Sequence, residues 1–148
     1  MLSVDTNIFV YAVDQSDPAK QTVALEVGRR AQASGAAIGV QVCGEFYVAS
    51  TRGLKRAPWE AAQAARNLMT AFATFSADRA NVERALAEAA AGRFSYWDAL
   101  LLSAADSAGC TVLFSEDLSD GARFGRVEIV NPFAPDGLSA RADELLTA

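Results

Sequence analysis

The stretch VDTNIF, residues 4–9, decides the fold. A short hydrophobic strand over Leu2–Val4 ends abruptly on the acid Asp5, and the residues from Thr6 to Val13 are again mostly apolar. Apolar side chains on so many sides indicate a buried helix, or one whose second face a partner covers, rather than an ordinary surface helix. An acid directly after a strand stands where ligands bind in a parallel α/β sheet, since the loops at the carboxyl ends of such strands converge on one crevice.

Strands and helices continue to alternate along the rest of the chain. Further strands are expected at 36–40, 74–76, 111–114 and 126–130, and further helices at 19–33, 41–51, 58–73, 78–91 and 96–108. Asp17 and Ser95 are expected as N-caps, and Gly109 as the end of the last of these helices. Strands separated by helices pair in parallel through right-handed crossovers. The sequence therefore predicts an α/β fold, a three-layer α/β/α sandwich with a central mainly parallel sheet, over residues 1–133, followed by a tail or short helix at 134–148.

Composition limits the possible functions. With 148 residues, 51% of them hydrophobic and 21% charged, the chain has the length and make-up of one globular domain. No apolar run approaches the roughly 20 residues that span a bilayer, and the start of the chain lacks the features of a signal peptide, so we expect a cytoplasmic protein without a membrane partner. The absence of histidine excludes a histidine base and a His/Cys zinc site, and Cys43 and Cys110 have no metal-ligand spacing. The net charge of −5 argues against broad, nonspecific binding of nucleic acid.

Four acids are expected at one edge of this sheet. Asp5 and Asp117 follow strands, and Glu45 and Asp98 begin helices that leave the same edge. Helical spacing also puts two of the acids on apolar faces, which is costly unless something pairs with them. Asp98 shares its face with Leu101, Leu102 and Ala105, and Glu45 shares its face with Val42, Val48 and Ala49.

A divalent cation is the simplest partner for such a cluster. Two carboxylates about 4 Å apart repel by roughly 4 kcal/mol at an effective dielectric near 20, and no lysine or arginine adjoins the acids closely in sequence. A ligand set made only of oxygen favours Mg²⁺ or Mn²⁺ over zinc. Each acid also has a plainer interpretation taken singly, because aspartate often caps a helix, complements a helix dipole or forms a turn.

Four segments together resemble the PIN-domain ribonucleases and, within them, the VapC-type toxins of bacterial toxin–antitoxin pairs. The resemblance runs to about Phe133 and rests on VDTNIFVYAVD, VQVCGEFYVAS, FSYWDALLLSAADSAGC and LFSEDLSDG. Within these segments Asp5, Glu45, Asp98 and Asp117 match the family's four acidic positions in order. Asn7 and Ser115 match polar positions beside the acids, and Asp120 resembles an accessory acid that could join the site.

The resemblance implies a metal-dependent endoribonuclease. Asp5, Asp98 and Asp117 would be the principal ligands of one or two Mg²⁺ or Mn²⁺ ions, and Glu45 would complete the site or help to deprotonate the attacking water. Arg52, Lys55 and Arg56 follow the helix that carries Glu45 and are candidate RNA contacts, although cations there could instead complement the helix dipole. The weaker candidates are Arg93, Arg123 and Arg126. The family further implies a cognate antitoxin and a homodimer, and the alternative is a noncatalytic PIN-like module that binds RNA or protein.

Overall fold

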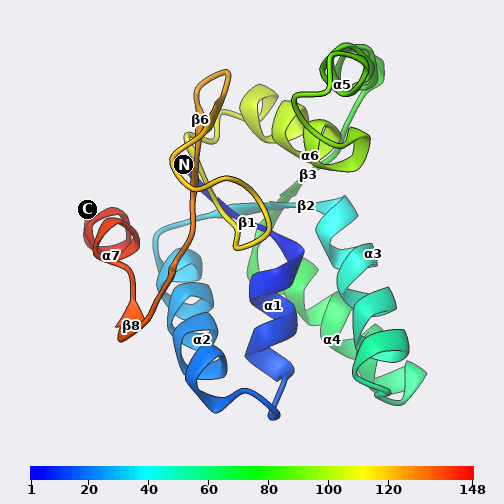
Figure 1. The fold of residues 1–148 in the computed structure, drawn as a ribbon. Helices are drawn as coiled ribbons and strands as arrows, with labels where there is room; N and C mark the ends of the chain where they lie inside the picture. Colours follow the sequence, from blue (N-terminus) through cyan, green and yellow to red (C-terminus); the bar gives the residue numbers. More distant parts are fainter.

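Four short strands form the centre of the sheet in the computed structural model, which describes residues 1–148 (Figure 1). Strand β1 pairs in parallel with β4, β4 pairs in parallel with β6, and β5 is an antiparallel strand at the edge. The bounds of these strands are β1 (Leu2–Val4), β4 (Val112–Phe114), β5 (Arg123–Phe124) and β6 (Val127–Val130). The side chains of β4 are all buried, as expected for a parallel strand covered on both faces.

Two further strands form a separate two-stranded sheet beside β1. Strand β2 (Ala37–Gly39) pairs in parallel with β3 (Ala73–Phe75), and β2 lies next to β1. All pairings are therefore parallel except that of β5 and that of a small hairpin near the C-terminus. The prediction of a mainly parallel sheet is confirmed.

Helices cover both faces of this sheet (Figure 1). Helices α5 and α6 lie on one face, and α1 to α4 lie on the other. Their bounds are α1 (Thr6–Val13), α2 (Pro18–Ala33), α3 (Val40–Val48), α4 (Pro58–Ala71), α5 (Arg79–Ala90) and α6 (Tyr96–Ser107). None of the eight residues of α1 is exposed, which agrees with its apolar sequence. The predicted three-layer α/β/α sandwich is thus confirmed.

Several helix ends follow directly from the sequence. The Asp17 side chain accepts a hydrogen bond from the Lys20 backbone before Pro18 opens α2, and Ser95 caps α6 in the same way. Gly109 ends α6 with a positive φ of 88°, which glycine adopts without steric cost.

The helix expected at 41–51 differs in the structure. Helix α3 already begins at Val40, directly after β2, and after Val48 it widens into the π-helical turn η1 (Ala49–Gly53). The Ser50 side chain is fully buried within this turn, and Lys55 follows with a left-handed φ of 58°. Widened turns of this kind occur often at functional sites.

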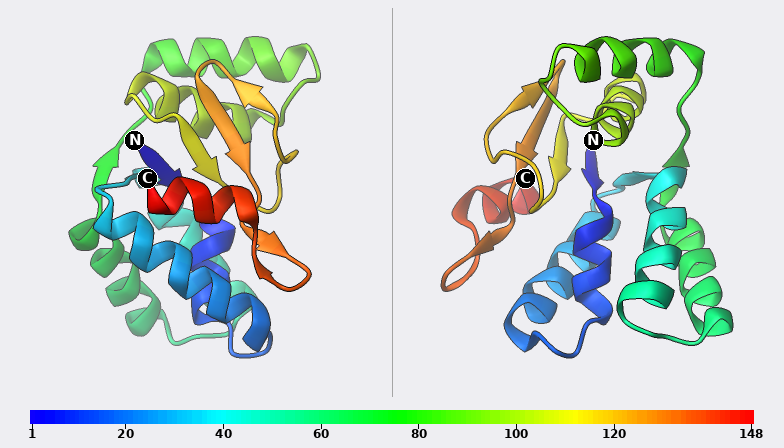
Figure 2. Two further views of the ribbon diagram at one scale, coloured as in Figure 1. Left: turned by 90° about the vertical axis from the view of Figure 1, so that its left-hand side faces the viewer. Right: turned by 45° about the vertical axis from the view of Figure 1, so that its right-hand side comes forward.

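The last residues form the hairpin β7 (Phe133–Ala134) and β8 (Gly137–Leu138), followed by helix α7 (Ala140–Thr147). Figure 2 shows α7 lying across α2. Arg30 of α2 fixes it there, because its guanidinium donates to Asp143 at 2.9 Å and to the Thr147 hydroxyl at 2.7 Å. None of the helices combines the length and the apolar character needed to cross a membrane.

Candidate active site

Asp5 stands at the carboxyl end of β1 and caps α1. The chain is fixed here by the Asp5 backbone N–H, which donates to the Phe114 carbonyl of β4 at 2.9 Å. One carboxylate oxygen, Oδ1, accepts from the Thr6 backbone N–H at 2.7 Å, and the other, Oδ2, accepts from the Ser115 hydroxyl at 2.8 Å. The residue is 8% exposed. Asp5 is therefore a buried acid whose hydrogen-bond donors are all uncharged.

Asn7 joins the start of α1 to the loop after β4. Its Nδ2 lies 3.3 Å from Asp5 Oδ2, 3.2 Å from Ser115 Oγ and 3.2 Å from Asp117 Oδ2. Its Oδ1 accepts from the Glu116 backbone N–H at 3.2 Å. Two acids that are more than 100 positions apart in the chain are thus held by one side-chain amide.

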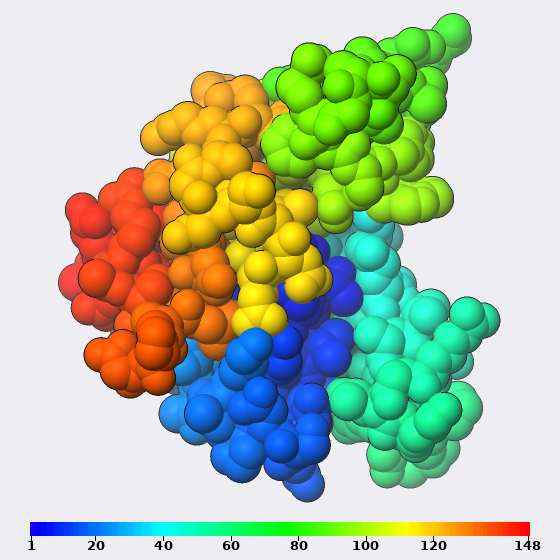
Figure 3. Space-filling model, viewed as in Figure 1, coloured from blue at the N-terminus to red at the C-terminus, as the bar shows by residue number.

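Asp98 approaches from the first turn of α6, on the other layer of helices. Its Oδ2 accepts from the Ser95 hydroxyl at 2.7 Å, and the same Ser95 oxygen accepts from the Asp98 backbone N–H at 3.3 Å. The residue is half-buried, and its charge acts on both Asp5 and Glu45. Figure 3 shows the hollow where the segment of α1, the start of α3 and the loop after β4 meet.

Glu45 lies on an open face of α3 and not on a core-facing one. Its Oε1 accepts from the Thr6 hydroxyl at 3.3 Å, which places it beside Asp5, but Glu45 and its neighbour Val48 are both exposed. The expected apolar environment is thus wrong for this acid, because α3 turns Val42 to the core and Glu45 to a groove. The groove has a volume of about 690 Å³ and is lined by Thr6, Gln41, Gly44, Glu45, Val48, Ala49 and Arg52.

Burial and mutual repulsion shift the proton affinity of this cluster. Burial raises the pKa of Asp5, and the charges of Asp98 and Asp117 add to the effect, while hydrogen bonds from Ser115 and Thr6 oppose it. Although the residue as a whole is exposed, partial desolvation of the Glu45 carboxylate raises its pKa, and the charge of Asp5 adds to that shift. Both shifts mean that ionised carboxylates are costly here without a cation.

The donor set suits a hard cation held partly through water. No group of three histidine, cysteine or acidic side chains stands at metal-binding distances. Mg²⁺ commonly keeps several waters and uses one or two carboxylates, so a ready-made cage of three acids is not required. Asp5, Asp117 and Asp98 offer the carboxylate oxygens, and Asn7 and Ser115 orient two of them. The residues therefore fit Mg²⁺ or Mn²⁺.

Asp120 has a hydrogen-bond partner outside the four acids. Its Oδ1 accepts from the Asn131 backbone N–H at 2.8 Å, which closes the loop between β4 and β6. The other acid of the loop, Glu116, accepts from the Tyr11 hydroxyl at 2.7 Å and pairs with Lys20 at 2.5 Å. Thr6 and Glu116 adjoin predicted site residues in the sequence, but no sequence signal marks Tyr11 and Lys20 or the contacts of these four side chains, which join segments far apart in the chain.

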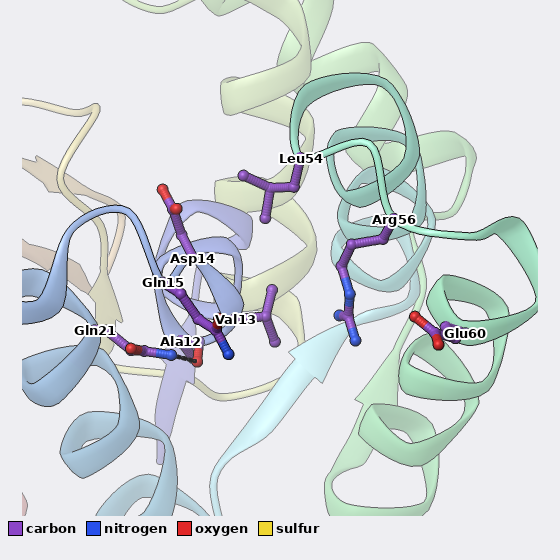
Figure 4. A pocket seen from close by; sticks show the side chains of 8 residues that line it. All are labelled: Ala12, Val13, Asp14, Gln15, Gln21, Leu54, Arg56 and Glu60. Atoms are coloured by element: carbon purple, nitrogen blue, oxygen red, sulfur yellow. Dashed lines mark hydrogen bonds between the residues drawn. The ribbon is translucent and has the colours of Figure 1, made fainter.

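The three cations after α3 divide between two places. Arg52 lines the groove beside Glu45, and Lys55 is exposed. Arg56 turns instead into a separate cavity of about 580 Å³ between the end of α1 and the start of α4, which Figure 4 shows. This cavity is lined by Ala12, Val13, Asp14, Gln15, Gln21, Leu54, Arg56 and Glu60. Arg56 Nη1 is buried there without a hydrogen-bond partner.

The weaker cationic candidates already have acidic partners. The nitrogen-to-oxygen distances are 2.6 Å for Arg93–Glu88, 3.7 Å for Arg123–Glu128 and 3.3 Å for Arg126–Asp106. These pairs neutralise part of the positive charge, so Arg52 is the cation that lies best for a substrate at the acids.

Comparison with known proteins agrees with this geometry. A family model described as PIN domain matches residues 2–128. The fold is similar to that of VapC20 from Mycobacterium tuberculosis, a toxin that cleaves the sarcin–ricin loop, with a TM-score of 0.62 and 20% identity over 79% of this chain and 90% of that one. It is also similar to a toxin–antitoxin complex from Klebsiella pneumoniae, with a TM-score of 0.61 and 20% identity over 90% of this chain and 98% of that one. No curated protein matches the sequence significantly.

Proposed function

The chain belongs to the PIN-domain family, and from this premise we propose that it is a metal-dependent endoribonuclease, the toxin of a type II toxin–antitoxin pair. The observation that carries the proposal is the Asn7 amide, which joins Asp5, Ser115 and Asp117. The charge of Asp98, from the opposite layer of helices, also acts on Asp5. Similarity to an RNA-cleaving toxin and to a toxin–antitoxin complex supports it. Both are likenesses of fold.

The acids divide the chemistry among them. We assign Asp5, Asp98 and Asp117 to holding Mg²⁺ or Mn²⁺, directly or through water; a single ion and a pair are both compatible with these ligands. The bound cation supplies polarisation of the scissile phosphate, a lower pKa of its water, and neutralisation of developing charge. Asn7 and Ser115 donate to Asp5 Oδ2 and so fix the orientation of the carboxylate that would hold the cation.

Glu45 either adds a ligand or takes the proton of the attacking water. A general base works best when its pKa lies near the operating pH, and burial and the charge of Asp5 raise the Glu45 pKa in that direction. The Thr6 hydroxyl, which donates to Oε1, orients the carboxylate. In-line attack of that water leaves a 3′-hydroxyl and a 5′-phosphate, as the family implies.

RNA would approach along the groove beside α3. Arg52 stands in that groove with Glu45, and Lys55 lies exposed beyond it, so both are placed to contact phosphates on one side of the cleavage point. Arg56 belongs to the neighbouring cavity and would contact RNA only beyond the end of α1. An open groove suits single-stranded or looped RNA, whose backbone bends and whose bases are accessible.

The proposal includes two protein partners, an antitoxin and a second copy of the chain. It also places the protein in the cytoplasm. A cognate antitoxin would cover the groove and block the acids, and the likeness of fold to a toxin–antitoxin complex from Klebsiella pneumoniae supports the existence of such a partner. A second copy of the chain would cover an apolar surface on α3, α4 and α6, where Val40, Met69 and Trp97 are 43%, 44% and 63% exposed. Patches of this kind commonly mark protein interfaces.

Cleavage of RNA by the purified protein, freed of any partner, tests the activity. We expect cutting with Mg²⁺ or Mn²⁺, none after chelation, and a loss of about 100-fold or more in Asp98→Asn, since even outer-shell partners of a metal are worth roughly 10–100-fold. The fold should persist in this variant, because Ser95 still caps α6. Asp136→Asn, the same change at an exposed turn, is the matched control. Cutting that survives both chelation and Asp98→Asn would refute the proposal, and RNA binding without any cutting in either metal would favour the noncatalytic binding module.

A further inference from the structure

Three side chains form a compact cluster next to the acids without belonging to them. The Glu116 carboxylate accepts from the Tyr11 hydroxyl at 2.7 Å through Oε1 and pairs with Lys20 Nζ at 2.5 Å through Oε2. Lys20 Nζ also lies 3.2 Å from the Tyr11 hydroxyl, so each member contacts the other two. We call Tyr11, Lys20 and Glu116 the anchor cluster.

Two aromatic rings lie close to the Lys20 ammonium group of the anchor cluster. Lys20 Nζ lies 4.6 Å from the centroid of the Tyr11 ring and 5.4 Å from that of Phe133. The two rings pack edge to face with their centroids 5.2 Å apart. Cation–π contact and partial burial of the Glu116 side chain, 22% exposed, make this pair better ordered than an exposed surface ion pair.

The anchor cluster ties α1, α2 and β7 to the loop after β4. Lys20 comes from α2, Tyr11 from α1, and Glu116 stands in the loop between Ser115 and Asp117, 96 positions after Lys20. Figure 3 shows the loop, in yellow, in contact with the blue segments of these two helices. The side chain of Glu116 thereby fixes the loop against a rigid pair of helices.

The backbone of Glu116 carries this constraint to the acids. Its N–H donates to Asn7 Oδ1 at 3.2 Å, which sets the orientation of the Asn7 amide and directs Nδ2 toward Asp5 and Asp117. Asn7 Nδ2 is the one side-chain partner of the exposed Asp117 carboxylate. Its position therefore depends on where the loop and Asn7 are held.

We propose that Tyr11, Lys20 and Glu116 are positioning residues, which hold Asn7 and Asp117 in the arrangement that binds the divalent cation. The inference deepens the proposed function and rests on it for its consequence in catalysis. The proposal assigns the anchor cluster no direct contact with substrate or cation. Loss of its ion pair would free the loop and weaken cation binding while leaving the RNA-binding groove intact.

Substitution of Lys20 tests this role with a conservative rescue. In Lys20→Met, which retains the apolar stem, we expect the dissociation constant for Mn²⁺, measured by calorimetry, to rise about 10-fold, the lower end for residues behind a metal's ligands. The kcat for RNA cleavage should fall with little change in KM. Lys20→Arg should restore most of the Mn²⁺ affinity, since a guanidinium also pairs with Glu116. Arg141→Met is the matched control, because it removes the Arg141–Glu128 pair of 2.7 Å elsewhere on the molecule.

A second measurement separates this inference from the proposed function. The side-chain amide resonances of Asn7, followed by NMR in protein labelled with ¹⁵N-asparagine, should shift or broaden in Lys20→Met and, to a smaller extent, in Tyr11→Phe, but not in Arg141→Met. This readout does not require RNA cleavage, so it tests the anchor cluster even if the wild-type protein cuts nothing. Wild-type Mn²⁺ affinity and unchanged Asn7 resonances in Lys20→Met would overturn the proposal. A rise in KM for RNA with unchanged Mn²⁺ affinity would overturn it too, because Lys20 would then be a substrate contact.

Discussion

Asp5 and Asp106 are both partly desolvated, but their pKa values shift in opposite directions. Burial works against ionisation of Asp106, but hydrogen bonds from Arg84 and Arg126 more than offset it and lower its pKa. Asp5 receives hydrogen bonds from uncharged donors alone, and its pKa stays raised by burial. The protein thus compensates one carboxylate and leaves the other in need of an external cation, which distinguishes a structural acid from a candidate functional one.

Asp5→Asn should gain stability relative to wild type as the pH rises. The pKa of Asp5 in the folded state is raised above its usual value of 3.8, which applies to the unfolded chain. At a pH between the unfolded-state pKa and the folded-state pKa, the folded protein therefore binds more protons than the unfolded one. The free energy of unfolding of metal-free wild type therefore loses the contribution of Asp5 as the pH rises through this interval, whereas asparagine does not titrate. Urea unfolding of both proteins without metal, from pH 4 to pH 7, measures the difference.

Mn²⁺ provides the control for this prediction. The cation should stabilise wild type at pH 7 by mass action and have much less effect on Asp5→Asn. A stability difference between the two proteins that does not change with pH would contradict the predicted pKa shift.

Single side chains also mark the limit of what the sequence could predict about the site. The positions of Asp5, Asp98 and Asp117 relative to strands and helices are local properties, and in the structure the charges of Asp98 and Asp117 both act on Asp5. The exposure of Glu45 and the turn of Arg56 into another cavity depend on how α3 and η1 lie against α1 and α4. Such packing joins distant segments and leaves no pattern of spacing in the chain.

At the scale of elements, the junction of β2 and α3 sets the direction of the helix that carries Glu45. Gly39 is the last residue of β2, and a Cβ there would stand 2.9 Å from the Leu101 side chain and 3.4 Å from that of Phe75. Gly44 lies within α3, and a Cβ added there would have no heavy atom within 4 Å. Close packing therefore requires glycine at position 39, whereas position 44 has room for a larger side chain.

Alanine at these two positions should have opposite effects on stability. Gly39→Ala forces Leu101 or the start of α3 to move and should cost about 1–3 kcal/mol of unfolding free energy, as overpacking does. Gly44→Ala should instead stabilise the protein by about 0.5–1 kcal/mol, because glycine within a helix costs conformational entropy. Urea unfolding at constant pH measures both changes. Equal effects of the two substitutions would show that the close approach at Gly39 does not constrain the junction.

Elements with strong end signals were predictable, and elements made by packing were not. Asp17 with Pro18, Asp78 and Ser95 mark helix starts through backbone hydrogen bonds that involve near neighbours alone, and α2, α5 and α6 begin beside them. The two-residue strands β5, β7 and β8 exist because a partner strand lies beside them. The π-helical turn η1 likewise has no local signal, since its sequence also suits an ordinary helix.

At the scale of the whole molecule, α2 differs from α3 and α4 in how much of its outer surface other elements cover. The face of α2 is partly covered by α7, whereas α3 and α4 have no further layer over them (Figure 2). Between α3 and α4 lies an apolar hollow of about 370 Å³, and Trp97 of α6 continues the surface, since its carbonyl accepts from the Gln41 side chain at 3.3 Å. The open apolar surface and the acids of the candidate site thus lie on neighbouring sides of α3.

A homodimer formed through this surface should dissociate when charge is introduced into it. In the double variant Val40→Asp, Met69→Asp, two exposed apolar side chains become anions, and a self-complementary interface would bring like charges together from both copies. Each position tolerates the change in the monomer, because Val40 begins α3, where an acid complements the helix dipole, and Met69 is 44% exposed on α4. We expect sedimentation velocity to show a dimer for wild type and a monomer for the variant. Leu25→Asp, at a side chain 54% exposed on α2, is the control and should remain dimeric. A wild-type protein that sediments as a monomer, or a variant that sediments as the wild-type dimer does, would rule out this interface.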